Sequence, residues 1–130
     1  MEKLKPNIFV QACPSREIFA RISGKWTIMI LLSLEKTPRR FNELKKTIDG
    51  ISQKVLTENL RSLERDGLIL RKVISSRPIK VEYSLTHLSL ELLEILKGLK
   101  DWTEDSMKLI LRHNENYDRA LINEQIRKSA

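Results

Sequence analysis

The sequence predicts an α+β fold: a winged helix-turn-helix with additional N- and C-terminal helices. Three observations lead to this class: a capped helix with one apolar and one polar face, a shorter helix before it across a tight turn, and two segments with strand periodicity after it. Helices and a β-hairpin in this order make up a winged helix. We expect one domain over residues 1–130, with an N-terminal arm at 1–12 and a C-terminal tail at 113–130 whose role the sequence leaves open.

The capped helix lies between Ser52 and Gly67. A serine hydroxyl can accept a hydrogen bond from a free N–H of the first helical turn, and a glycine ends a helix in the left-handed conformation without strain. Leu56, Leu60 and Leu63 recur at helical spacing, which predicts a buried stripe. On this stretch alone, an ordinary amphipathic surface helix is the simpler interpretation, and the flanking segments change that interpretation.

Two helices are predicted near the start of the chain. The first runs from about Ser15 to Ser23, stops at Gly24, and is expected to bury Ile18, Phe19 and Ile22. The second opens at Lys25 and continues through Leu34. It is apolar nearly all round, so we expect it at the centre of the core.

The segment before the capped helix predicts the first half of the helix-turn-helix. Residues 39–41 are expected to be extended, and Asn42 is the expected N-cap of a helix that ends at Ile48 and buries Leu44. Asp49-Gly50 is a turn signal that leads directly into the capped helix.

After Gly67 the period changes from helix to strand. Residues 68–74 are rich in branched apolar side chains, residues 80–85 alternate with period two, and residues 75–79 connect them. This pattern predicts a β-hairpin, the wing. Thr86 is the expected cap of the helix that follows.

The C-terminal helix has an apolar stripe wider than one small domain needs to cover. The stripe is formed by Leu92, Ile95, Leu99, Trp102 and Leu109, and it is widened by Leu93, Leu96, Met107 and Ile110. Packing on its own domain is the alternative, and we prefer a subunit interface. The polar run at residues 114–116 is expected to weaken the helix, with a further short helix at 117–127.

Positive charge is concentrated in the part of the chain that contains the predicted helix-turn-helix. The formal net charge is +7, with 17 Lys and Arg against 8 Asp and Glu in residues 1–80 and 7 against 9 in residues 81–130. Such an excess attracts polyanions such as duplex DNA, although an acidic protein or an anionic membrane surface would be attracted too.

Six sequence blocks occur in one order over about residues 13–102: Cys13-Pro14, Gly24 to Thr27, Pro38 to Leu44, Gly50 to Thr57, Leu60 to Leu68, and Val81 to Thr86. Together they resemble the HxlR family of bacterial winged-helix transcriptional regulators. The resemblance implies a cytoplasmic homodimer that binds operator DNA. It also implies that the N-terminal helix before the helix-turn-helix and the C-terminal helix are dimerisation helices that form the dimer contact. The chain departs from the family pattern at Ser89, where relatives carry a glycine nearby, and in having a single wing proline, Pro78.

The predicted DNA-binding residues come from three segments. In the capped helix, Gln53 can pair with adenine, Lys54 can reach guanine or a phosphate, and Thr57 can touch a thymine methyl. Other members of the set are expected at phosphates, which position the protein without specifying bases, and Arg77 at the hairpin tip can enter the minor groove instead. The complete set is Arg39, Arg40, Ser52, Gln53, Lys54, Thr57, Arg61, Arg77 and Lys80.

Cys13 is the single cysteine, so no internal disulfide is possible. It precedes a predicted helix, and the helix N-terminus together with Arg16 is expected to lower its pKa and favour the thiolate. Two interpretations stay open: a sensor of oxidants or electrophiles, as in some members of the resembled family, or an inert, half-buried small side chain.

Other classes of function have little support in the sequence. His87 and His113 lack the neighbouring ligands of a metal site, no Gly-rich phosphate loop occurs, and no catalytic set emerges, so we expect neither an enzyme nor a cofactor. No apolar run is long enough to span a membrane, and the first residues lack the apolar region of a secretion signal, so we expect a cytoplasmic protein. The competing hypothesis is a winged-helix interaction module that binds an acidic protein instead of specific DNA.

Overall fold

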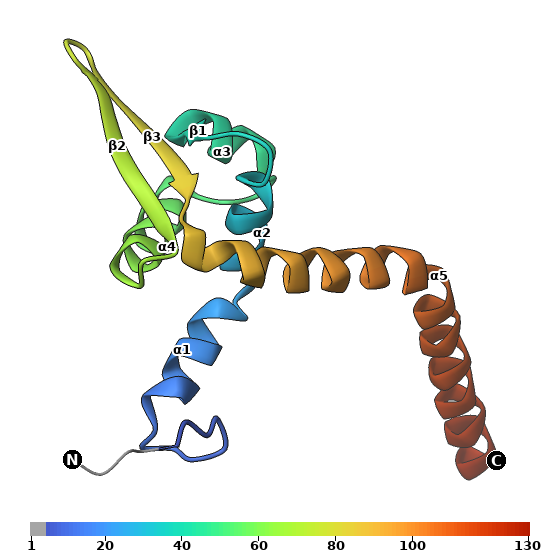
Figure 1. Ribbon diagram of the computed structural model, residues 1–130. Helices are drawn as coiled ribbons and strands as arrows, with labels where there is room; N and C mark the ends of the chain where they lie inside the picture. Colours follow the sequence, from blue (N-terminus) through green and yellow to red (C-terminus); the bar gives the residue numbers. More distant parts are fainter. Residues whose placement is uncertain (1–4) are drawn as a thin grey trace. The chain divides into compact units, whose positions relative to one another are not determined.

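The computed structural model describes residues 5–130 and forms eight elements (Figure 1). The chain divides into two compact units, Met1–Leu96 and Lys97–Ala130. The elements are α1 (Pro14–Ile22), α2 (Lys25–Ser33), β1 (Arg39–Arg40), α3 (Phe41–Thr47), α4 (Gln53–Arg65), β2 (Ile69–Ser76), β3 (Ile79–Leu85) and α5 (His87–Ser129).

The core of the first unit forms around α2, as its composition predicts. Ile30 and Leu31 of α2 are fully buried, and Leu44 and Ile48 pack in the same cluster from α3 and its C-terminal end. The prediction for the start of α3 was wrong by two residues. The N-cap is Arg40, not Asn42, because the Glu43 carboxylate accepts the Arg40 N–H at 2.9 Å and fixes the first turn there.

Helix α4 has the caps that the sequence predicts. Ser52 Oγ accepts the Val55 N–H at 3.1 Å, and Gly67 follows the last turn with φ of +76°. Leu56, Leu60 and Leu63 are buried against the core. A polar link adds to this packing, since the hydroxyl of Thr27 in α2 lies 3.0 Å from Asn59 Oδ1 in α4.

The sheet is antiparallel with the strand order β1-β3-β2. β2 and β3 form the predicted hairpin, which runs from the Ile69–Leu85 pair to the Ser76–Ile79 pair, with an irregularity between Val73 and Ser75. The two strands lie side by side in Figure 1. β1 pairs with β3 at Arg39–Tyr83 and Arg40–Glu82, so the expected extended stretch is the third strand of the wing sheet.

Two predictions about the C-terminal part were wrong. Helix α5 continues through residues 114–116 without a break, because asparagine disfavours a helix interior only modestly. Thr86 does not cap α5 with its hydroxyl, which donates instead to the Gly67 carbonyl oxygen at 2.7 Å. Ser89 bonds the main chain at the start of α5 instead. Its Oγ accepts the Thr86 N–H at 3.2 Å and donates to the Thr86 carbonyl at 2.9 Å.

The predicted burial of α1 was also wrong in this chain. None of its residues is fully buried, and Ile18 and Phe19 are 42% and 55% exposed. Only Ile22 of the three predicted residues packs partly against the core. The apolar side of α1 therefore faces water because no described element of the same chain covers it.

The leucine face of α4 gives a direct test of this packing. Leu60 is 2% exposed, so Leu60→Ala should lower the free energy of unfolding by about 2–5 kcal/mol through lost burial and a residual cavity. Glu58→Ala, on the exposed side of the same helix, should change it by less than about 0.5 kcal/mol. Urea denaturation of both variants measures the difference, and equal effects would contradict the assignment of faces.

Candidate nucleic-acid interface

The start of α4 presents its polar side chains to solvent. Gln53 and Lys54 are exposed in the first turn, directly after the N-cap Ser52. The Ser52 oxygen accepts an N–H, which leaves its hydroxyl proton free to donate to a ligand. Thr57 differs, because its hydroxyl donates to the Gln53 carbonyl at 2.8 Å and its methyl group is the part left for an apolar contact.

Two neighbouring hollows bring predicted residues of different elements together. One, of about 400 Å³, lies beside the exposed part of α4 and is lined by Thr57, Arg61 and Glu64 together with Arg71 of β2. The other, of about 550 Å³, is lined by Arg40 and Lys80 among others. Phe41 and Tyr83 line both hollows, so α3 and β3 connect the cations of the wing to those of α4.

Two predicted arginines lie apart from these groups. Arg39 is half-buried, and its Nε donates to the Ser33 carbonyl at 3.0 Å, so this side chain ties the start of β1 to the end of α2. Arg77 lies at the exposed tip of the hairpin, between the last residue of β2 and the first of β3.

Sequence reasoning missed two features of this surface. The predicted set omits Arg71, but the strand register places it opposite Tyr83, and both residues line the same hollow as Arg61. The ion pair between Arg21 and Asp66 was not anticipated at all, because 45 residues separate the partners. The pairing of residues on adjacent strands was the one signal that could have pointed to Arg71.

The Arg21–Asp66 pair joins α1 to the end of α4. Arg21 Nε and Nη2 donate to the two Asp66 carboxylate oxygens at 2.9 and 3.0 Å, a bidentate geometry that is partly shielded from solvent. The hydrogen bond with Asp66 raises the pKa of Arg21 above its ordinary value. Since Asp66 is the C-cap of α4, this pair couples the position of α1 to that of α4.

Cys13 is the N-cap residue of α1, and its thiol has two hydrogen-bonding neighbours. Its Sγ lies 3.0 Å from Ser15 Oγ and accepts the Asn7 N–H at 3.4 Å. The Ser15 hydroxyl, followed by the Asn7 and Ser15 N–H groups, lowers the pKa of Cys13, and burial opposes them. The predicted direction is therefore confirmed, but Arg16 is not among the causes.

Residues 5–130 contain no group of three or more His, Cys, Asp or Glu side chains placed to hold a metal ion. No helix within that range is both long and apolar enough to cross a membrane.

A capped helix with a polar outer face, a short helix before it and a basic hairpin after it define a winged helix-turn-helix. Residues 21–110 match the model of the HxlR-like helix-turn-helix family. The chain is 37% identical over 105 residues to the HTH-type transcriptional regulator YtfH of Escherichia coli K12, covering 81% of this chain and 83% of YtfH.

Solved structures support the same assignment. The transcriptional regulator YtfH from Salmonella typhimurium is similar with a TM-score of 0.81 and 34% identity, over 85% of this chain and 99% of that one. Diamide-treated YodB from B. subtilis is similar with a TM-score of 0.61 and 32% identity, over 74% of this chain and 96% of that one. The chain belongs to the HxlR-like helix-turn-helix family of DNA-binding transcription regulators.

The thiol environment leads to a prediction about Cys13. Ser15→Ala removes the first cause of the lowered pKa, so the pKa should rise and the pH profile of thiol alkylation should move to higher pH. Arg16→Ala is the matched control and should leave the profile unchanged. Rates of iodoacetamide alkylation against pH measure both, and a profile that followed Arg16 instead of Ser15 would overturn the assignment.

Proposed function

We propose that the protein binds specific operator DNA as a homodimer, with α4 in the major groove and the hairpin against the adjacent backbone or minor groove. The observation that carries the proposal is the division of α4 into a buried leucine face and an exposed face with Gln53 and Lys54 in its first turn. A helix anchored in this way keeps its polar side chains in a fixed position relative to base edges.

The predicted residues divide into two roles in this proposal. Gln53 and Lys54 read bases, because they are exposed at the N-terminal end of α4, the end that reaches base edges in helix-turn-helix proteins. Cations of the neighbouring hollows and the hairpin tip contact phosphates, which adds affinity without sequence preference. This second group is Arg40, Arg61, Arg71, Arg77 and Lys80. We assign Arg39 a supporting role, since its Nε already binds the main chain.

The proposed dimer contact uses the outward apolar stripe of α5. Leu93 and Leu96 of α5 are buried in the first unit, whereas Leu99 and Trp102 are 50% and 61% exposed. Exposed apolar side chains at helical spacing typify an interaction surface. A two-fold dimer would place two copies of α4 on half-sites about 34–36 Å apart, or a multiple of that distance.

We further infer a cytoplasmic regulator without catalytic activity whose DNA binding responds to modification of Cys13. The lowered thiol pKa supports reactivity, and a diamide-treated structure exists for the similar protein YodB. With one cysteine per chain, oxidation can end in a disulfide to a second chain or to a small thiol. Cys13 and Arg21 lie on the same helix, so a shift of α1 would reach α4 through Asp66.

The competing function, binding of an acidic protein, predicts a different response to DNA. Specific DNA binding gives steep salt dependence together with a sequence preference that persists at high salt, whereas an interaction module gives only weak, sequence-independent binding.

The division of roles can be tested on a selected operator and on random duplex DNA. Gln53→Ala should weaken operator binding by on the order of 1–3 kcal/mol and relax the preference at one base pair per half-site. Arg77→Ala should weaken binding to both DNAs and reduce the salt slope by about one per half-site. Fluorescence anisotropy at several salt concentrations measures both. Equal loss on both DNAs for Gln53→Ala, with none for Arg77→Ala, would reverse the roles.

The dimer can be tested by placing a charge in the α5 stripe. Leu99→Glu should produce monomers and lose operator affinity, because a carboxylate would be buried without a partner. Lys108→Gln makes the same change in net charge nine residues later, on the opposite side of a helix, and should leave the dimer intact. Sedimentation equilibrium gives the mass of each variant. A dimeric Leu99→Glu variant with normal operator affinity would remove this face from the interface.

A further inference from the structure

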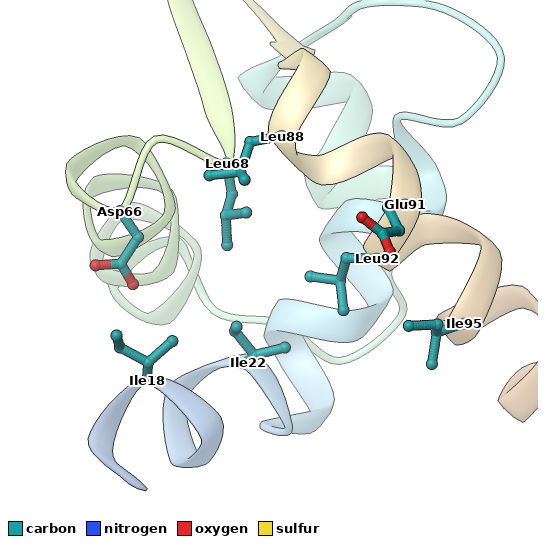
Figure 2. A pocket seen from close by; sticks show the side chains of 8 residues that line it. All are labelled: Ile18, Ile22, Asp66, Leu68, Leu88, Glu91, Leu92 and Ile95. Carbon is teal, nitrogen blue, oxygen red and sulfur yellow. The ribbon is translucent and has the colours of Figure 1, made fainter. Parts of the chain in front are cut away.

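Two hollows of the first unit differ in the character of their walls. Figure 2 shows an apolar one beside α1 and the start of α5, and its lining includes Leu92 and Ile95 of the stripe that predicts the dimer contact. This apolar hollow is therefore part of the proposed dimer contact. The hollow of about 400 Å³ between α4 and the hairpin is polar, and its charged residues point to a different ligand.

Two arginines from different elements line this polar hollow, Arg61 of α4 and Arg71 of β2. Both residues are exposed, and within residues 5–130 neither guanidinium has an ion pair or a hydrogen bond. Two like charges that line one small space repel each other, and an anion between them relieves that repulsion. Because no carboxylate of the described chain holds either arginine, both can turn toward the same anion.

The charge of the lining matches a phosphodiester. Glu64 also lines the hollow, so among the described residues its charged groups are two arginines and one glutamate, a net charge of +1. Each phosphodiester of a DNA backbone carries one negative charge, whereas a phosphomonoester carries about −1.5 to −2 at pH 7. Charge complementarity therefore favours a backbone phosphodiester over a free phosphate or a phosphomonoester.

The position of the hollow is also that of a DNA backbone under the proposed function. Thr57 lines the hollow, and its hydroxyl donates at 2.8 Å to the carbonyl of Gln53, the proposed base-reading residue one turn earlier. With α4 in the major groove and the hairpin at the adjacent minor groove, the backbone that separates the two grooves passes between α4 and the hairpin. The polar hollow lies between these two elements.

We propose that this hollow holds one phosphodiester of the DNA backbone, bound by Arg61 and Arg71 together. The proposal rests on the proposed function and deepens it, because it assigns two cations to the same phosphate instead of to two separate ones. Each guanidinium can donate two N–H groups to phosphate oxygens. The shared phosphate joins α4 to β2, so the base-reading helix and the hairpin engage DNA as one unit.

The test measures salt dependence on random duplex DNA, for which no operator is needed. Each neutralised phosphate contributes about 0.9 to the slope of log affinity against log salt, and a second cation on the same phosphate adds no further charge to neutralise. Arg61→Gln and Arg71→Gln should therefore each leave the slope nearly unchanged. The double variant should lose about 0.9 per bound subunit. Fluorescence anisotropy at several salt concentrations measures all three slopes.

The matched control is Arg71→Gln combined with Arg77→Gln. Arg77 lies at the hairpin tip outside the lining of the hollow, so the slope of this pair should fall by the sum of the two single losses. Arg61→Gln combined with Arg71→Lys should keep the slope of the unmodified protein, because one cation remains in the hollow. Thermal unfolding of each variant checks that these exposed substitutions leave the fold intact.

Three results would overturn the shared phosphate. A loss of about 0.9 from each single variant would place the arginines on separate phosphates, and an unchanged slope in the double variant would remove both from the DNA. Displacement of DNA by millimolar inorganic phosphate at constant ionic strength, in the unmodified protein but not in the double variant, would assign the hollow to a free anion. The ratio of operator to random affinity is measured separately, so loss of the shared phosphate leaves the proposed function standing.

Discussion

The burial of one face of α4 is the constraint on which the rest of the fold depends. Leu56, Leu60 and Leu63 enter the same cluster as Ile30 and Leu31 of α2, and this packing determines which side chains of α4 remain outside. Because the helical period is 3.6 residues, a stripe of leucines on the inside leaves Lys54 and Arg61 on the outside, whereas Gln53 is exposed because it lies in the first turn of the helix. The Thr27–Asn59 contact further restricts rotation of α4 on α2. The proposed DNA-binding surface is thus a consequence of core packing and not an independent feature.

Most of this arrangement could be predicted because its signals are local. The Ser52 cap, the glycine after α4 and the leucine spacing all lie within one helix, and each agrees with the structure. Predictions that required knowledge of distant partners were incomplete. Arg39 was predicted at a phosphate, and its bond to the Ser33 carbonyl has no local signature in the sequence. The pairing of β1 with β3 across more than forty residues has none either. The sequence also predicted burial of Ile18 and Phe19, since periodicity indicates an apolar face but not which molecule covers it.

Asp66 shows how an unfavourable local choice can be explained by a distant contact. A negative charge at the C-terminal end of a helix opposes the helix dipole, so a cation would be the more stable choice there. The Arg21 guanidinium offsets this effect by pairing with both carboxylate oxygens, and in doing so it attaches an otherwise poorly packed α1 to α4. The pair is partly exposed, so its contribution to stability is small. The pair matters mainly for the position of α1, because no residue of this helix is fully buried.

The same weak attachment of α1 bears on the proposed regulation through Cys13. An element can shift at low cost only if its contacts are few, and α1 has no fully buried residue. Yet α1 has Cys13 as its N-cap residue and Arg21 in its last turn. Under the proposed function, a modification of Cys13 would act on this weakly packed helix and reach α4 through the Arg21–Asp66 pair. By linkage, operator binding would in turn change the free energy of that modification through the position of α1.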